Sequence, residues 1–385
     1  MLSFRDNLRA LPAAAWILFG GTFINRFGTF VVPFLILYLT KIGYTSTQAG
    51  MAIGAYGIGL LIASSAGGHL ADRIGRRNTI VMSMFGSAAA ILALSQARGY
   101  ATIVVLTGIT GSLSELYRPA SYALVGDLVA EEHRVSAMGV YRFAVNLGVA
   151  AGLATAGFLA DHSFILLFIG DAATSIVYGL IALFALPQGL RTYAKNERTG
   201  EALRVAARDR PFVIFLLATL CATIIDFQMG STFALHVKSL GFPSSTYGLL
   251  ISTNGLLIVL FELGITQWTR RFPPRPMIAL GYLLAGAGFA LTGFARTFPA
   301  LAATVVIWTL GEMISSPVAG AYAVQLAPEQ YRGRYLGLFM TMWSLGMIIG
   351  PPAGTFVFAR NPAFVWAACG VLGVISAALM LRRPR

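Results

Sequence analysis

Long apolar runs recur along this sequence, and each is long enough to cross a lipid bilayer. A membrane-spanning helix needs about 20 predominantly apolar residues, and backbone polar groups in lipid must find their partners within the segment. We therefore expect an all-α integral membrane protein with twelve transmembrane helices. The predicted spans are 13–39, 46–70, 77–96, 100–128, 136–160, 163–186, 211–238, 244–269, 276–295, 298–326, 334–358 and 362–381.

The charged residues support this interpretation and predict the orientation. Only 11% of the 385 residues are charged, whereas soluble domains carry about 25%. The net charge of +13 would favour a nucleic-acid partner in a soluble protein. With a cytoplasmic N-terminus, however, twenty basic residues fall on the cytoplasmic side and five on the other, which is the positive-inside pattern. We expect both termini in the cytoplasm and no nucleic-acid partner.

Positions 198 residues apart carry matching residues in the two halves of the chain. One constant offset joins all the matches without a gap, which indicates a duplicated unit of six spans. The matched pairs are Gly43 and Gly241, Gly50 and Gly248, Pro119 and Pro317, Arg134 and Arg332, Gly148 and Gly346, and Gly152 and Gly350.

The duplication predicts the domain organisation. We expect an N-terminal six-helix bundle at 1–187, a cytoplasmic linker at 188–210 and a C-terminal six-helix bundle at 211–385. Parallel repeats of this kind place a substrate site between the halves near the bilayer midplane, and rocking of the halves gives alternating access. A membrane receptor or scaffold that does not transport is the alternative from another functional class.

The loop between the second and third predicted spans carries the most specific motif. It reads Gly68-His69-Leu70-Ala71-Asp72-Arg73-Ile74-Gly75-Arg76-Arg77. This loop resembles the signature cytoplasmic loop of the major facilitator superfamily, and the resemblance covers the whole chain. It implies the major facilitator fold, two pseudo-symmetric six-helix bundles, and secondary active transport. The repeat copy at 265–275 has lost the aspartate and both glycines.

The loop predicts a cytoplasmic gate. Glycine permits close helix approach and tight turns, and an acid can meet the positive N-terminal end of a helix in the other half. Asp127, at the end of the fourth span, is placed to pair with Arg73 or Arg76. The alternative is that these charges only enforce topology. The expected gating residues are Gly68, Asp72, Arg73, Gly75, Arg76, Arg77, Asp127 and Arg142.

Several charges lie inside the first six spans, where each costs at least about 2.5–3.5 kcal/mol and usually marks a pathway or a pair. Glu115 and Arg118 are three residues apart and share a helix face. One interpretation is a local pair that never meets substrate; the other is a cluster with Arg26 that binds an anion or sets the gate. Two arginines would keep Glu115 ionised, which makes it a poor proton carrier. Asp171 is a further acid, in the sixth span.

The second half contains acids with no cation within one helical turn, namely Asp226 and Glu312. Away from water an unpaired carboxyl favours its neutral form, which suits a group that gains and loses protons. The stretch from Leu310 to Pro317 resembles the tenth span of multidrug:proton antiporters, which implies proton coupling or cationic-drug binding by its glutamate. Glu262 is equally consistent with a structural pair. The expected proton-coupling residues are Glu312, Asp226, Glu115 and Glu262.

Aromatic residues near the midplane add a possible wall for cationic substrates, although most aromatics in such a chain simply pack. Together with the charged positions they give the expected substrate-binding residues. These are Arg26, Glu115, Arg118, Tyr117, Asp226, Phe227, Trp308 and Glu312.

The sequence contains no phosphate-cradling loop and no nucleophile constellation, so we expect neither ATP use nor enzymatic activity. We expect no metal and no cofactor, with the proton gradient as energy source. The leading hypothesis is proton-coupled efflux of lipophilic or cationic small molecules by a monomeric multi-pass protein of the bacterial inner membrane. The alternative is a proton-coupled symporter for a polar metabolite such as a peptide, amino acid or organic anion, which the Arg26 cluster favours.

Overall fold

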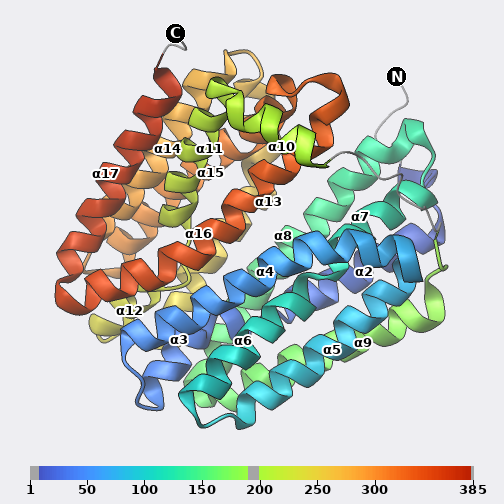
Figure 1. Cartoon of the computed structure of the whole chain (residues 1–385). Coiled ribbons are helices and arrows are strands. Elements are labelled where there is room, and N and C mark those ends of the chain that lie inside the picture. Colours follow the sequence, from blue (N-terminus) through green and yellow to red (C-terminus); the bar gives the residue numbers. More distant parts are fainter. Residues whose placement is uncertain (1–7, 190–198, 383–385) are drawn as a thin grey trace. The chain divides into compact units, whose positions relative to one another are not determined.

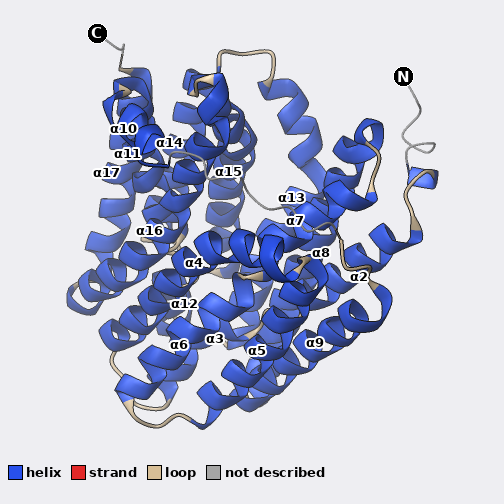
Figure 2. Ribbon diagram, turned by 45° about the vertical axis from the view of Figure 1, so that its right-hand side comes forward, coloured by secondary structure: helices blue, strands red, loops and turns tan. Residues whose placement is uncertain are grey.

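The computed structural model describes residues 8–189 and 199–382, and within these ranges the regular elements are helices without any strand (Figure 2). Ten segments of the described chain are long and apolar enough to cross a membrane. An all-helical, multi-pass membrane fold is therefore confirmed. The ten segments are Ala13–Lys41, Ser46–Ile74, Arg76–Gln96, Glu131–His162, Phe164–Ala185, Ser244–Thr269, Pro274–Thr292, Phe298–Leu326, Glu329–Arg360 and Pro362–Leu381.

Two predicted spans do not appear among these ten segments, and each of them is divided. The span predicted at 100–128 forms α6 (Tyr100–Glu115) and α7 (Tyr117–Leu128). The span predicted at 211–238 forms α11 (Arg210–Asp226) and α12 (Thr232–Ser239). Average hydropathy does not register a break in the backbone, so the sequence predicted one long helix in each place. The count of twelve spans in two six-helix bundles stays a prediction.

The first predicted span is divided as well, into α2 (Ala13–Phe27) and α3 (Val31–Lys41). All three breaks follow closely on a charged residue, namely Arg26, Glu115 and Asp226. Non-helical backbone at membrane depth is tolerated where protein surrounds it or where it lines a cavity. The breaks therefore mark the positions at which the spans depart from simple lipid-facing rods.

The contacts divide the chain into two units. Unit 1 consists of Met1–Leu35 and Ala55–Lys195, and unit 2 of Ile36–Gly54 and Asn196–Arg385. Unit 1 contains α2, α6, α7 and most of α4 (Ser46–Ile74), together with α5 (Arg76–Gln96), α8 (Arg134–His162) and α9 (Phe164–Ala185). Unit 2 contains α11 and α12 with α10 (Thr199–Arg208), α13 (Ser244–Thr269), α14 (Pro274–Thr292), α15 (Phe298–Leu326), α16 (Arg332–Arg360) and α17 (Pro362–Leu381) (Figure 1).

Each unit encloses an aromatic core of its own. In unit 1 the core includes the fully buried rings of Tyr117 and Tyr178 beside Tyr141. In unit 2 the rings of Phe212 and Tyr335 lie 4.1 Å apart between centroids. Large buried aromatic rings contribute most of the apolar area of such cores.

The glycines of the repeat have matching structural roles. Gly148 and Gly152 bring α8 against α2, and Gly346 and Gly350 bring α16 against α11. A Cβ added to Gly148 would lie 2.8 Å from a carbonyl oxygen of α2, and one added to Gly350 would lie 3.0 Å from a carbonyl oxygen of α11. Membrane helices approach this closely only where residues are small. The constant offset of the sequence therefore corresponds to one packing arrangement used in both units.

The turn pair of the repeat also matches. Gly43 has a φ of 103° and Gly241 a φ of 85°. These values lie in the left-handed region that residues with a Cβ seldom adopt. The same backbone requirement thus recurs 198 positions later.

The predicted linker at 188–210 contains α10, which packs against α11 and α16 of unit 2. Its positions 190–198 lie outside the described residues. Asp209 follows α10 and caps α11, because one carboxylate oxygen accepts a hydrogen bond from the Phe212 amide at 3.2 Å. The other oxygen accepts a hydrogen bond from the Tyr335 hydroxyl at 3.1 Å. The end of the linker is thereby fixed to unit 2.

Candidate functional site

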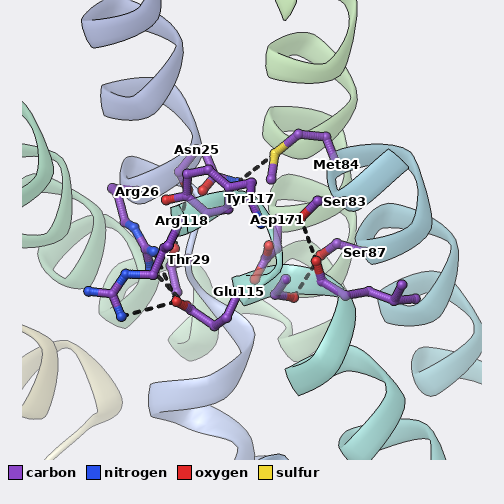
Figure 3. A network of polar contacts seen from close by, with 12 residues as sticks. Asn25, Arg26, Thr29, Ser83, Met84, Ser87, Glu115, Tyr117, Arg118 and Asp171 are labelled. Atoms are coloured by element: carbon purple, nitrogen blue, oxygen red, sulfur yellow. Dashed lines mark hydrogen bonds and ion pairs between the residues drawn. The ribbon is translucent and has the colours of Figure 1, made fainter. Parts of the chain in front are cut away.

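Three of the predicted charged residues meet in unit 1 (Figure 3). Both terminal nitrogens of Arg26 donate to the Glu115 carboxylate, at 3.1 and 3.3 Å. Arg118 contacts the same carboxylate at 3.2 Å. The local pair of Glu115 and Arg118 therefore forms and Arg26 joins it, while anion binding or gating by the cluster stays a prediction.

The cluster carries one more positive than negative charge. Only 9% of Arg26 and 8% of Glu115 is exposed, whereas the Arg118 side chain is 47% exposed. The Arg26 guanidinium lies over the Tyr117 ring, 5.3 Å from its centroid, in cation–π geometry. The Arg26 Nε has no hydrogen-bond partner among the described residues. Arg118 is thus the member of the cluster with a free face, and the excess charge can attract an anionic group.

Serines of α5 fix the break between α6 and α7. The Ser83 hydroxyl donates to the Leu113 carbonyl at 2.5 Å and accepts from the Tyr117 amide at 3.2 Å. The Ser87 and Ser114 hydroxyls lie 2.7 Å apart. These bonds hold both sides of the break and thereby position Glu115. These serines were not predicted as site residues, since nothing in the sequence links them to the fourth span.

Asp171 of α9 has a structural role at the break in the first span. One of its carboxylate oxygens accepts hydrogen bonds from the Phe30 and Val31 amides, each at 3.1 Å. These amides open α3, where the helix dipole favours negative charge. The acid that the sequence left without a role therefore stabilises the break that follows Arg26.

Unit 2 has a carboxyl cluster with different chemistry. Asn254 of α13 donates to Glu312 of α15 at 2.9 Å and to the Thr309 hydroxyl at 3.1 Å. Glu312 acts electrostatically on the Asp226 carboxyl, and a further acid, Glu262, acts on Glu312. In the chain as described, Asp226 makes no side-chain hydrogen bond or ion pair. Asn254 is a residue that the sequence analysis missed, because an asparagine in an apolar run has no specific signature.

The predicted aromatic residues divide into two kinds. Phe227 follows Asp226 at the end of α11 and meets the Trp343 ring edge-on at 6.1 Å. Tyr117 and Trp308, by contrast, are 0% and 3% exposed. Trp308 stacks on Phe289 at 4.9 Å. Packing inside each unit covers nearly all of the surface of Tyr117 and Trp308, and their substrate contact stays a prediction.

The signature loop is tied to the end of α7 by an ion pair within unit 1. Arg76 contacts Asp127 at 2.5 Å, so the choice between Arg73 and Arg76 falls on Arg76. Gly75 has a φ of 94°, which confirms the tight turn between α4 and α5. The Arg77 amide donates to the Gln188 carbonyl at 3.5 Å, and this contact brings the start of the linker to the loop.

Gly68 differs from the expectation. A Cβ at Gly68 would have no atom within 4 Å, whereas one at Gly67 would lie 2.8 Å from the Leu116 carbonyl oxygen. The close helix approach is thus made by Gly67, one position earlier on the helix. Asp72 makes no hydrogen bond or ion pair in the part of the chain that the structure describes. The gating roles of Asp72, Arg73 and Arg142 stay predictions.

No three His, Cys, Asp or Glu side chains gather into a metal site in the ranges 8–189 and 199–382. Both cysteines, Cys221 and Cys369, are free. Neither of the two polar clusters thus presents, within these ranges, the ligand set of a metal centre.

The sequence matches the family model described as Major Facilitator Superfamily over residues 18–245 and again over 215–385. An uncharacterized MFS-type transporter of Bacillus subtilis, YqjV, is 26% identical over 88% of this chain and 85% of its own length. The Na(+), Li(+), K(+)/H(+) antiporter of Planococcus maritimus is 25% identical, covering 87% of each protein. The multidrug resistance protein MdtH of Aeromonas hydrophila is 24% identical over 97% of this chain and 96% of MdtH.

Solved structures agree on the fold. The nucleoside transporter NupG superposes with a TM-score of 0.83 at 15% sequence identity, over 96% of this chain and all of that one. Together with the family match, the apolar helices and the signature loop identify a membrane transporter rather than an enzyme. This chain belongs to the major facilitator superfamily.

Proposed function

We propose that this protein is a proton-coupled antiporter that exports lipophilic cationic small molecules. The observation that carries the proposal is the carboxyl cluster of unit 2. Glu312 and Asp226 repel each other, and Glu312 has a neutral amide, Asn254, as its hydrogen-bond partner. Two neighbouring acids with no arginine bonded to them can be neutralised either by a proton or by a cationic substrate.

Exchange follows from that competition. A cation that binds between the two carboxyls stabilises their charged forms and displaces a proton. A bound proton, in turn, lowers the affinity of the carboxyls for the cation. The two ligands therefore compete for the same negative charge, which is the physical requirement for antiport. The duplicated units would expose the site to each side of the membrane in turn, by alternating access.

Relatives support this direction of transport by their names. One is a multidrug resistance protein and another exchanges alkali cations for protons. Proton exchange and a cationic substrate are both compatible with an acidic cluster. We propose the proton gradient as the energy source, with both termini in the cytoplasm of a bacterial cell.

The test is drug efflux from proteoliposomes driven by an imposed pH gradient. Glu312→Gln keeps the shape of the side chain and removes its charge, so we expect efflux of a lipophilic cation to fall to the level of empty liposomes. Glu329→Gln is the matched control, because Glu329 lies exposed in the turn before α16. Undiminished efflux by Glu312→Gln would refute the proposal.

A second candidate function rests on the cluster in unit 1. Its excess positive charge and the half-exposed Arg118 favour an anionic group, such as the carboxylate of a peptide or amino acid. Under this alternative the protein is a proton-coupled symporter. Thermal stabilisation of the purified protein by dipeptides or organic anions, together with none by lipophilic cations, would favour symport over export.

A further inference from the structure

A small hollow opens at one end of unit 2, about three helical turns along α11 and α15 from the carboxyl cluster. It lies where α11 and α14 begin and where α15 and α17 end. The hollow is far smaller than pockets for transported or drug-sized molecules, which measure about 300–1,000 Å³, so it can receive only a small polar group. The residues of its wall that matter here are Ile214, Phe215, Arg275, Tyr322, Leu379 and Arg382.

Arg275 is held in the wall by the end of α17. Its Nε donates to the Met380 carbonyl at 3.0 Å, and one terminal nitrogen donates to the Arg382 carbonyl. A guanidinium has five N–H donors, so donors remain for an acceptor in the hollow. The Arg382 side chain is exposed beside it, and Arg210 precedes the first residue of the wall in α11. The nearby acid, Asp209, already accepts two hydrogen bonds from its own surroundings.

Tyr322 provides an unused donor at the same place. Its side chain lines the hollow although only 9% of the residue is exposed. The ring packs edge-on against Phe215 at 5.3 Å, which fixes its orientation. Its hydroxyl has no hydrogen-bond partner among residues 8–189 and 199–382. The hydroxyl is therefore free to donate to a ligand in the hollow.

We propose that this hollow binds the phosphate group of an anionic membrane phospholipid. Arg275 and Arg382 would neutralise the phosphate and Tyr322 would donate to one of its oxygens, since arginine matches phosphate geometry. The apolar part of the wall includes Ile214 and Leu379, which belong to α11 and α17, so it suits the start of an acyl chain. Basic pockets between transmembrane helices on the cytoplasmic side bind lipid headgroups in this way.

The distribution of charge in unit 2 supports a lipid at this end. Helix connectivity brings most of its arginines to the end that carries the hollow, including Arg270, Arg271, Arg332 and Arg334. The opposite end carries few basic residues, among them Arg360. Anionic lipid headgroups are attracted to a basic surface at roughly 1 kcal/mol per arginine, which corresponds to about a fivefold change in affinity.

Lipid binding can be measured on the intact protein in detergent by native mass spectrometry. Phosphatidylglycerol is the probe, phosphatidylcholine with the same acyl chains tests the need for net negative charge, and glycerol 3-phosphate tests a soluble phosphate. Arg382→Gln and Tyr322→Phe are the variants, because Arg275 also caps α17 and its loss would affect folding. Arg360→Gln, at the other end of unit 2, is the matched control.

We expect saturable binding of phosphatidylglycerol that Arg382→Gln weakens about fivefold, that the double variant weakens further, and that Arg360→Gln leaves unchanged. Equal occupancy in the wild type and the double variant would overturn the site. Displacement of the lipid by an equal concentration of glycerol 3-phosphate would refute the proposal of a lipid ligand and assign the hollow to a soluble phosphate. The outcome is independent of the direction of transport.

Discussion

Glu115 holds two arginines at once, so replacing it with glutamine tests how the cluster of unit 1 is built. In Glu115→Gln the shape is kept, but Arg26 loses the carboxylate that accepts from both its terminal nitrogens. Arg26 is 9% exposed and cannot turn to water, so the variant strands a buried charge. Breaking a buried pair in this way costs about 3–5 kcal/mol.

The structure also predicts an order among the three single variants. Arg26→Gln should cost less than Glu115→Gln, since Glu115 keeps Arg118 at 3.2 Å. Arg118→Gln should cost least, below about 1 kcal/mol, because that side chain is 47% exposed and water replaces the lost contact. The double variant, Arg26→Gln with Glu115→Gln, removes both buried charges, so neither is left without its partner. The double variant should therefore be more stable than Glu115→Gln alone.

The assay is thermal unfolding of the purified variants in one detergent. The measured quantity is the fraction of protein that stays monodisperse after heating. The free-energy coupling of Arg26 and Glu115 comes from the double-mutant cycle. Additive effects, or an Arg118→Gln variant as unstable as Glu115→Gln, would refute the geometry of the cluster. Arg360→Gln is the control, since its guanidinium lies exposed at the end of α16.

Two further substitutions test the packing of unit 1 by the same thermal assay. Asp171→Ala should lower stability by about 1–3 kcal/mol, because it leaves the Val31 amide unbonded at the start of α3, whereas the Phe30 amide keeps its bond to the Gly28 carbonyl; wild-type stability would contradict this role. Gly152→Ala should destabilise the contact of α8 with α2, because the new Cβ would collide with the Phe27 carbonyl. Gly139→Ala, where the Cβ meets open space, should be neutral, and equal effects of the two would argue against the close approach.

The charged candidates show how far sequence reasoning reached in the site. Arg26, Glu115 and Arg118 were identified from their position in apolar runs, and the structure brings all three together. Their identification succeeded because a charge at membrane depth is costly and rarely accidental. Tyr117 and Trp308 were less reliable candidates, since an aromatic ring carries no comparable cost and burial decides its role.

The partners of these charges could not be predicted in the same way. Asn254 on Glu312 and Asp171 on the start of α3 are contacts between residues 58 and about 140 positions apart. Neither residue has a distinctive spacing to its partner. Such pairs depend on which helix faces meet, and helix packing is set by the combined shape of many side chains.

The sequence by itself determined that this protein is a helical membrane transporter of the major facilitator superfamily with a duplicated pattern. Bilayer thickness and the cost of buried charge act on local stretches of chain, so they can be read from local composition. Only the tertiary structure decided where the spans break, that Gly67 rather than Gly68 makes the close approach, and which side chains complete the clusters. Those features depend on contacts between helices that are distant in sequence, and local sequence does not predict such contacts.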